Sequence, residues 1–241
     1  MLGNLFTPNS GVKRIWFFEE IASTQTFLER EENLTAGDLV VARHQSEGRG
    51  RLSRTWNDES GCSILFSIAL PVSEVLTLAV GVGVIRALLA LSPALSLKWP
   101  NDIVLDDVAG YRKVGGIITT KVNDEIAIAG VGINLIAPEG EHRALGLADL
   151  IEGSLDVSKI LKSIIDAVIN TANQDVTEIL QQFRDYTSSL NRSVRIQAIN
   201  GKSVFGRVID IANDGALILE TDNGPIRIIS GDVEYLRLAH D

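Results

Sequence analysis

The chain has almost no cysteine, no long apolar run and no leader signal, the features typical of disulfide-bonded, membrane-spanning and secreted proteins. Its 241 residues include one cysteine, Cys62, which can form no internal disulfide bond and so indicates a reducing, cytoplasmic compartment. Apolar runs such as residues 87–91 are far shorter than the ~20 residues of a membrane-spanning helix. The first residues lack the basic and apolar regions of a secretory signal. We therefore expect a soluble, cytoplasmic, globular protein in which Cys62 is buried.

Basic residues and histidines are scarce as well. The 22 lysines and arginines are outnumbered by 31 acidic residues, and a net charge of −9 argues against a protein that binds nucleic acid by neutralising phosphates. The three histidines, His44, His142 and His240, stand far apart and form no cluster with the spacing of metal ligands. We expect neither a DNA partner nor a metal site built from histidine ligands.

Hydrophobic periodicity predicts two domains. Residues 1–189 mix strand and helix patterns, including a helix over residues 73–91 in which Gly81 and Gly83 indicate close packing against a sheet. Past Asn191, short β-type runs separated by turns, one of them at residues 200–201, predict an all-β module over residues 190–241. About 50 residues bury little core alone, so this module is expected to dock on the first domain. The expected strands are residues 14–19, 38–45, 63–70, 95–98, 103–105, 113–121, 125–132, 194–198, 204–211, 216–220 and 226–229, and the other expected helices begin at Ser23 or cover residues 158–170 and 175–186.

A loop between two predicted strands, residues 46–57, concentrates positive charge in this acidic chain. Residues 48–51 read Gly-Arg-Gly-Arg, and we call residues 46–57 the arginine loop. Guanidinium groups this close repel one another unless anionic oxygens lie between them, so the loop predicts a site for phosphate or carboxylate groups. The alternative is a solvated loop whose arginines pair with nearby carboxylates. The arginines in and beside the loop are Arg43, Arg49, Arg51 and Arg54.

Residues 98–102 read Lys-Trp-Pro-Asn-Asp and follow a predicted buried strand. A lysine there is costly unless it meets an anion, so Lys98 is expected to face a phosphoryl or acyl group that is being transferred. The alternative is a lysine that reaches solvent beside a core tryptophan, Trp99. Asn101 and Asp102 either cap the turn or bind Mg²⁺ through oxygen atoms.

Glycines stand in two further predicted strands, at residues 113–117 (Lys-Val-Gly-Gly-Ile) and 130–134 (Gly-Val-Gly-Ile-Asn). Glycine within a strand often marks close approach of a ligand, so both segments are candidates for the floor of one pocket. Neither matches the dinucleotide fingerprint or the Walker loop, and no nucleophile with a partner base is evident.

In this order along the chain, the segments resemble biotin protein ligases. The tail over residues 191–237 looks like the C-terminal barrel of that family, so the resemblance covers nearly the whole chain. It implies an α+β fold, in which a catalytic core like that of class II aminoacyl-tRNA synthetases, a mixed sheet backed by helices, is followed by a small SH3-like β-barrel. The motifs that carry the resemblance are Ser23-Thr24-Gln25, Gln45, Gly-Arg-Gly-Arg with Arg54 and Trp56, Lys-Trp-Pro-Asn-Asp, Lys113 with Gly115-Gly116, and residues 130–134.

The resemblance implies a two-step reaction with biotin, ATP and Mg²⁺. The carboxylate of biotin attacks the α-phosphate of ATP, and a lysine of a biotin carboxyl carrier domain, from a carboxylase such as acetyl-CoA carboxylase, then takes the biotinyl group. Arg49 and Arg51 would gather the anionic groups, and Lys98 would stabilise charge where they react, so its removal is expected to impair the chemistry most. The implied biotin contacts are Ser23, Thr24, Gln25, Gln45, Arg49, Gly50, Arg51, Lys98, Gly115, Gly116 and Gly130. The implied ATP contacts are Arg51, Arg54, Asn134 and Trp56, which would stack on adenine.

The chain departs from the family pattern at three positions. Gln25 stands where asparagine is frequent, Glu47 where alanine is frequent, and Ser53 where glycine is frequent. Gln25 keeps the amide but adds a methylene group. Glu47 places a carboxylate in the anion-binding loop, where it either tunes loop closure or pairs with an arginine before the ligand arrives. Ser53 removes backbone freedom.

Three further expectations concern the type of enzyme. Repressor-type members carry a winged-helix domain before the Ser-Thr motif, which here begins at Ser23, so we expect a monofunctional ligase that binds no DNA. The alternatives are a lipoate or octanoyl ligase or transferase, and a binding protein without transfer activity. The arginine loop argues against the transferases, which use no ATP, and Lys98 with Arg49 and Arg51 argues against a binding protein. The implied sheet edge can pair with a second copy or with the carrier, and no residue decides whether the chain forms a homodimer.

Overall fold

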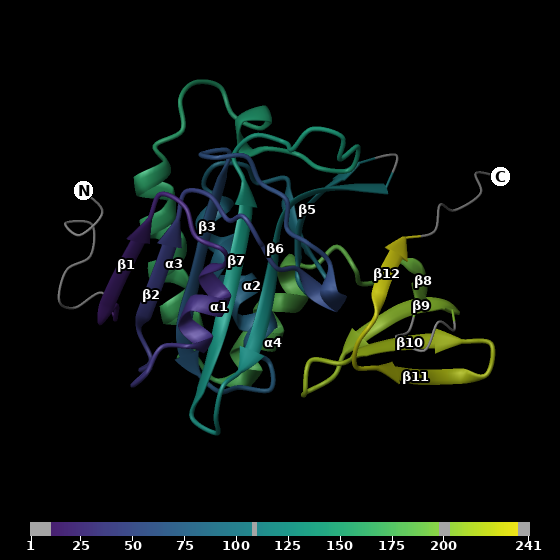
Figure 1. Cartoon of the computed structure of the whole chain (residues 1–241). Helices are drawn as coiled ribbons and strands as arrows, with labels where there is room; N and C mark the ends of the chain where they lie inside the picture. Colours follow the sequence, from purple (N-terminus) through teal and green to yellow (C-terminus); the bar gives the residue numbers. More distant parts are fainter. Residues whose placement is uncertain (1–10, 108–109, 198–202, 236–241) are drawn as a thin grey trace.

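Two β-sheets organise the computed structural model, which describes residues 11–107, 110–197 and 203–235 (Figure 1). The large sheet has the strand order β1-β2-β3-β7-β6-β5-β4, and the small sheet has the order β11-β10-β9-β8-β12. Figure 1 shows α1 on one face of the large sheet and α2, α3 and α4 on the other. This arrangement, a mixed sheet backed by helices and followed by a small antiparallel β domain, confirms the predicted fold class.

The observed elements follow the predicted pattern closely. The large sheet contains β1 (Arg14–Phe18), β2 (Asp38–Ala42), β3 (Ser63–Pro71), β4 (Leu95–Lys98), β5 (Asp102–Asp107), β6 (Gly110–Lys121) and β7 (Ile126–Asn134). The helices are α1 (Thr24–Glu29), α2 (Leu76–Leu88), α3 (Val157–Ala172) and α4 (Val176–Tyr186), with single 3-10 turns η2 (Arg51–Ser53) and η3 (Leu147–Asp149). The small sheet contains β8 (Ser193–Gln197), β9 (Ser203–Ile211), β10 (Leu217–Thr221), β11 (Gly224–Ile228) and β12 (Asp232–Tyr235). The predicted turn at residues 200–201 and His240 lie outside the described residues.

Two sequence-based expectations about these elements need correction. Strand β12 was not expected, because its sequence, Asp-Val-Glu-Tyr, contains two acids and buries Val233 alone among its four side chains. Cys62 is half-buried, so the expectation of a buried cysteine was wrong. It directly precedes β3, and its backbone oxygen accepts hydrogen bonds from the amides of Leu135 and Ile136.

Side-chain alternation gives the two faces of the large sheet different surfaces. In β2, Leu39 and Val41 belong to the main core with α2, whereas Val40 packs with Leu28 of α1 and Ile128 of β7. The side chains on the α2 face are mostly branched and large. Small residues, among them Ser67, Gly130 and Gly132, stand on the α1 face, and this leaves room for a pocket there.

The small sheet is docked on the large one, as predicted. The indole Nε1 of the buried Trp99 donates to the backbone oxygen of Gly215 at 2.9 Å, and the backbone amide of Trp99 donates to Ser189 Oγ at 3.0 Å. One continuous cluster of buried apolar side chains includes residues of both sheets. The domain boundary after residue 189 stays a prediction. None of the helices in the described part of the chain has the length and apolar character needed to cross a membrane.

Replacing Gly83 with alanine is expected to lower the free energy of unfolding by about 1–3 kcal/mol, the usual cost of overpacking. A Cβ at Gly83 would lie 2.6 Å from the backbone Cα of Val168, so α2 and α3 would have to move apart. Gly81→Ala is the matched control, because its Cβ would meet the side chain of Leu97 at an ordinary 3.4 Å. Urea denaturation of both variants checks this, and equal losses would contradict it.

Candidate active site

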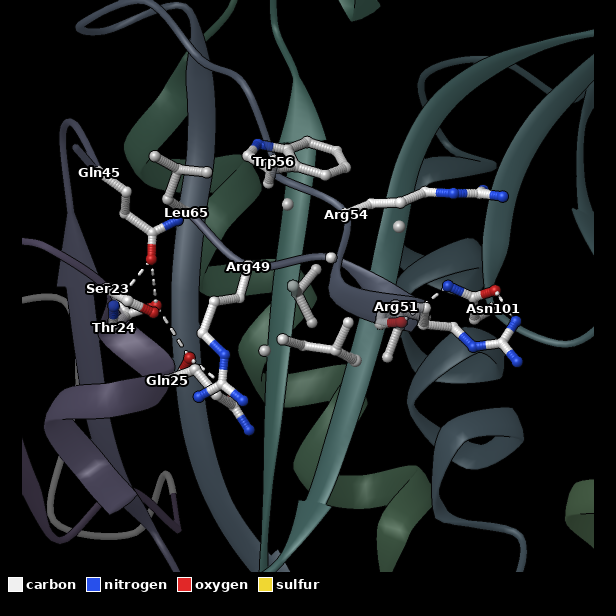
Figure 2. Close-up of a pocket in the computed structure, with 18 of the residues that line it drawn as sticks. Ser23, Thr24, Gln25, Gln45, Arg49, Arg51, Arg54, Trp56, Leu65 and Asn101 are labelled. Carbon is white, nitrogen blue, oxygen red and sulfur yellow. Dashed lines mark hydrogen bonds between the residues drawn. The ribbon is translucent and has the colours of Figure 1, made fainter. Parts of the chain in front are cut away.

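A pocket opens on the α1 face of the large sheet, where the arginine loop passes over β6 and β7 (Figure 2). Figure 2 shows Thr24, Gln25 and Gln45 at one end and Arg51 and Asn101 at the other, with Arg49 and Trp56 between them. The predicted site residues that line the pocket are Ser23, Thr24, Gln25, Gln45, Arg49, Gly50, Arg51, Arg54, Trp56, Gly116 and Gly130. Predicted site residues that are up to 107 positions apart in the sequence, from Ser23 to Gly130, therefore line one cavity.

Three predicted site residues do not line this pocket. Gly115 faces the opposite side of the sheet from Gly116, and a Cβ there would lie 2.4 Å from Ile133 Cδ1. Asn134 is buried at the end of β7, where its Nδ2 donates to the backbone oxygen of Leu145 at 3.4 Å. Lys98 lines a neighbouring cavity. The pleat, which turns successive side chains to opposite faces, explains the placement of Gly115.

One end of the pocket is a network of uncharged polar groups. Gln45 Oε1 accepts from the Thr24 amide at 2.7 Å and from Thr24 Oγ1 at 2.9 Å, and Thr24 Oγ1 lies 2.9 Å from Ser67 Oγ. Ser23 begins α1 as its N-cap and accepts from the amide of Thr26. In the described part of the chain, Gln45 Nε2 has no protein acceptor and is free to donate to a ligand.

Gln25 directs its amide to the sheet. Its Nε2 donates to Thr120 Oγ1 at 3.2 Å and to the backbone oxygen of Ile128 at 3.3 Å, and its Oε1 accepts from Ser67 Oγ at 3.2 Å. A Cβ at Gly130 would lie 2.7 Å from that Oε1, so the glycine makes room for the longer amide. Both polar atoms of the Gln25 amide have hydrogen-bond partners within the protein, and a contact between Gln25 and biotin stays a prediction.

Three arginines of the loop region pair with carboxylates, as the solvated-loop alternative predicts. Arg49 Nη1 donates to Glu29 Oε2 of α1 at 2.7 Å, and Arg54 pairs with Asp232 of β12. Arg43 lies 3.7 Å from Glu19. Glu47 stands where the family frequently has alanine, and it was a possible partner for an arginine of this loop. Arg49 instead pairs with Glu29.

Arg51 differs from these three arginines. It donates to Asn101 Oδ1 at 3.0 Å and to Ser230 Oγ at 3.2 Å, and no carboxylate of the described residues forms an ion pair with it. Burial lowers the pKa of Arg51 below its ordinary value, although nearby Asp232 and Asp102 oppose this. An arginine stays protonated despite such a shift. Arg51 therefore brings a positive charge without a bound counter-ion to the pocket, as an anion-binding residue would.

Two lysines share one half-buried carboxylate beside Arg51. Asp102 Oδ1 lies 2.7 Å from Lys113 Nζ, and Asp102 Oδ2 lies 3.4 Å from Lys98 Nζ. Burial raises the pKa of Asp102, but the charges of Lys113 and Lys98 lower it by more. The net pKa is therefore below its ordinary value, and the carboxylate stays ionised to a lower pH than usual. Lys98 is 5% exposed and its Nζ lies 4.6 Å from the centre of the Tyr111 ring. The structure thus supports an anion partner for Lys98, and that partner is Asp102.

Lys113 lines the same pocket as the predicted biotin contacts, and its side chain is 37% exposed. In the sequence, Lys113 belongs to a motif that indicates no role for it. A charged residue in a predicted strand, two positions before a pair of glycines, was the available signal. From sequence, nothing distinguished its placement from that of Lys98, because long-range strand pairing brings both lysines to Asp102: the pairing of β4 with β5 places Lys98 there, and the pairing of β5 with β6 places Lys113.

Trp56 lies on the glycines of the sheet. A Cβ at Gly132 would be 2.6 Å from its indole ring, and a Cβ at Gly116 would be 3.3 Å from it. The pocket keeps about 130 Å³ of free space. This is less than the roughly 300 Å³ of small ligand pockets, so entry of a larger ligand requires Trp56 or the arginine loop to shift. The flat glycine surface suits a planar ring.

The residues proposed for Mg²⁺ are already occupied by protein partners. Both oxygens of Asp102 face lysines, and Asn101 accepts from Arg51 while its Nδ2 donates to the Ile117 backbone oxygen at 2.8 Å. Within the described ranges, no three His, Cys, Asp or Glu side chains are grouped as metal ligands. These residues do not fit a protein-bound magnesium ion.

Comparisons with known proteins agree with this geometry. Residues 17–135 match the Biotin/lipoate A/B protein ligase family, and residues 189–235 match the Biotin protein ligase C terminal domain. The chain is 30% identical over 218 residues to the biotin–[acetyl-CoA-carboxylase] ligase of Mycobacterium tuberculosis, covering 83% of this chain and 80% of that one. It is 28% identical to the bifunctional ligase/repressor BirA of Bacillus subtilis, over 90% of this chain and 73% of BirA.

Solved structures extend the agreement to the whole fold. The biotin protein ligase from Aquifex aeolicus in complex with biotin and ATP has a TM-score of 0.80 at 26% identity, over 94% of this chain and 100% of that one. The Leishmania major ligase in complex with biotinyl-5-AMP shares the fold at 23% identity with a TM-score of 0.64, over 93% of this chain and 99% of that one. From the matches to both of its parts, the chain belongs to the biotin protein ligase family.

Proposed function

We propose that this protein is an ATP-dependent ligase that activates biotin as biotinyl-5′-AMP and transfers it to a lysine of a biotin carboxyl carrier domain, such as that of acetyl-CoA carboxylase. One observation carries the proposal: a single pocket joins uncharged polar groups at one end to unneutralised positive charge at the other. Biotin has the same division, with a polar, uncharged ring at one end and a carboxylate at the other.

The uncharged end is the proposed site of the biotin ring. Gln45 Nε2 and the hydroxyl groups of Ser23 and Thr24 supply hydrogen bonds to buried polar atoms of the ligand, which need partners once water is excluded. Gly116 and Gly130 allow the ligand to approach the strands closely. Gly50, between Arg49 and Arg51, keeps the loop backbone close to the same ligand.

The charged end is the proposed site of the first reaction. A carboxylate oxygen of biotin attacks the α-phosphorus of ATP, and pyrophosphate leaves with the electrons of the broken P–O bond. Arg49 and Arg51 reduce the repulsion between the two anions, and Lys98 supports them from behind Asp102. We add Lys113, which lies on the pocket side of Asp102. Arg54, Trp56 and Asn134 are the proposed nucleotide contacts, with Trp56 against adenine.

In the second reaction the amine of the carrier lysine attacks the carbonyl carbon of the adenylate. The C–O bond to AMP breaks, AMP leaves with its electrons, and the nitrogen loses a proton as the amide forms. Mg²⁺ enters this scheme as a complex with ATP, as part of the substrate. A cytoplasmic location, the absence of a DNA partner and the formation of a homodimer stay predictions.

Intact-mass analysis tests the function. A biotin carrier domain is incubated with this protein, ATP, magnesium and biotin, with a parallel reaction that contains lipoate. A mass gain equal to one biotinyl group, dependent on ATP, is the expected result. A gain with lipoate alone would identify a lipoate ligase, and no gain with either would favour a binding protein.

The arginine loop is expected to exchange its backbone amide hydrogens more slowly when biotinyl-5′-AMP is bound. Its ion pairs through Arg49 and Arg54 are exposed and contribute about 0–1 kcal/mol each, so opening the loop in the free protein costs little. A bound adenylate adds charged partners for several arginines at once. Hydrogen–deuterium exchange of residues 46–57 measures this, and equal protection with and without ligand would contradict it.

A further inference from the structure

A side-chain pair that the proposed reaction does not use closes the base of the arginine loop. His44 precedes the loop, Asp58 follows it, and His44 Nδ1 lies 2.9 Å from Asp58 Oδ2. The Asp58 side chain is 0% exposed and that of His44 is 28% exposed. Because an ionised carboxylate can only accept, the Nδ1–H of His44 donates this hydrogen bond.

The burial of Asp58 is costly for a residue at the end of a surface loop. A buried carboxylate is tolerated when its oxygens have hydrogen-bond partners, and leaving one unpartnered destabilises the protein. Asp58 Oδ1 is buried and has no partner in the described part of the chain. His44 is therefore the side chain that keeps this carboxylate in place, and the exit of the loop depends on the contact.

Backbone hydrogen bonds leave a gap at this position. Above it, the Trp56 amide donates to the Gly48 oxygen at 2.9 Å, and below it the Gly61 amide donates to the Arg43 oxygen at 3.1 Å. Between these two bonds, the amides of Ser46 and Glu47 donate to the segment before α1, at residues 21 and 22, instead of to the exit of the loop. The His44–Asp58 bond bridges the two arms of the loop in this gap.

The same pair is connected to the substrate-binding residues. The backbone oxygen of His44 accepts from the Ile21 amide at 3.1 Å, just ahead of Ser23, and His44 is followed directly by Gln45. Asp58 follows Trp56 by two residues. A shift of this pair would therefore displace the entrance to α1, Gln45 and Trp56 together.

We propose that His44 and Asp58 form a clasp, and that both are positioning residues that hold the arginine loop over the pocket. The expected effect of the clasp on the KM for ATP and biotin rests on the proposed function. Its expected effect on the position of the loop in the free protein does not depend on any activity. Breaking it leaves the chemical groups intact and allows the loop to separate at its base.

The test compares Asp58→Ala with Asp58→Asn, because the amide oxygen of asparagine still accepts from His44 Nδ1–H. Asp58→Ala is expected to raise the KM for ATP and biotin about tenfold, corresponding to one hydrogen bond to a charged group, with a smaller change in kcat. Asp58→Asn is expected to restore KM to within about threefold of the original protein. His44→Ala and His44→Gln form the same comparison from the other side.

Hydrogen–deuterium exchange of residues 48–56 in the protein without substrates supplies the second readout. Both alanine variants are expected to speed exchange there, and both amide variants are expected to leave it near the original rate. Asp38→Ala is the matched control, since Asp38 is also 0% exposed at its side chain but pairs with Arg14 at the edge strand, away from the pocket. It is expected to lower thermal stability without changing KM or loop exchange.

Two results would overturn the clasp. Unchanged loop exchange in Asp58→Ala and His44→Ala would show that the pair does not hold the loop. Asparagine behaving like alanine at position 58 would show that the hydrogen bond is not the contact that matters. If the original protein transferred no biotin, the proposed function would fail, and the exchange measurement on free protein would still decide the clasp.

Discussion

Replacing Lys113 with alanine is expected to slow the formation of biotinyl-5′-AMP by about 10²–10³-fold, the loss typical of a single group that stabilises developing charge. Lys113 is the lysine on the pocket side of Asp102, at 2.7 Å from it, and it lines the cavity that holds the proposed biotin contacts. Charge builds up there as a carboxylate and a phosphate approach each other. Pyrophosphate release at saturating ATP and biotin measures the first reaction by itself.

Lys98→Ala is the matched comparison, because Lys98 contacts the same carboxylate, Asp102, as Lys113 does. Lys98 is almost entirely buried behind Asp102 and opens into the neighbouring cavity, so its loss is expected to slow the same step by about tenfold, through the position of Asp102. The motif alone predicts the larger loss for Lys98. A greater effect of Lys98→Ala than of Lys113→Ala would restore that order and contradict the assignment from the structure. Thermal denaturation of both variants checks that they are folded.

Local signals in the sequence were sufficient for most of the fold. The cap at Ser23, the amphipathic period of residues 175–186 and the β-branched residues of β2 each depend on neighbours a few residues away, and they predicted α1, α4 and β2. Strand β12 lacks such a signal, because its acidic residues pair with β8 through the backbone and its one buried apolar residue gives no period. Tertiary pairing determines that strand.

The candidate site shows the same division. The residue types that could bind an anion or a polar ring were recognisable in sequence, and the fold brings eleven of the predicted residues into one pocket. Which face each residue occupies was not recognisable, and Gly115 and Gly116 therefore separate at the sheet. The partners of the arginines could not be predicted from the sequence either, since Asp232 lies 178 residues from Arg54 and Ser230 lies 179 residues from Arg51.

These long-range partners give the small sheet a role at the pocket. Ser230, just before β12, accepts from Arg51, and Asp232, the first residue of β12, pairs with Arg54, so both arginines contact the C-terminal part of the chain as well as the pocket. Ser230 is uncharged, whereas Asp232 neutralises its arginine. The small sheet therefore orients Arg51 without neutralising it, and Arg51 is the arginine best prepared for phosphate.

Replacing Arg51 with alanine is expected to slow adenylate formation by about 10²-fold and to raise the KM for ATP. The guanidinium lies in a partly dry environment, where its attraction to phosphate oxygens is stronger than in water. Arg51→Lys keeps the charge but loses the planar fork that binds two oxygens at once, so an intermediate loss is expected. Initial rates of pyrophosphate release at varied ATP measure both quantities.

Arg54→Ala is the matched control within the same loop. Arg54 lines the same pocket, but its side chain is 66% exposed and is already paired with Asp232, so a phosphate must compete with that carboxylate and with water. Its loss is expected to raise the KM for ATP by less than tenfold and to leave the rate at saturating ATP nearly unchanged. Equal effects of Arg51→Ala and Arg54→Ala would mean that pairing with a carboxylate does not distinguish the arginines. The distinction matters because three of the four arginines are paired within the protein, and we propose that the charge that remains at Arg51 makes the loop an anion-binding element instead of a solvated surface.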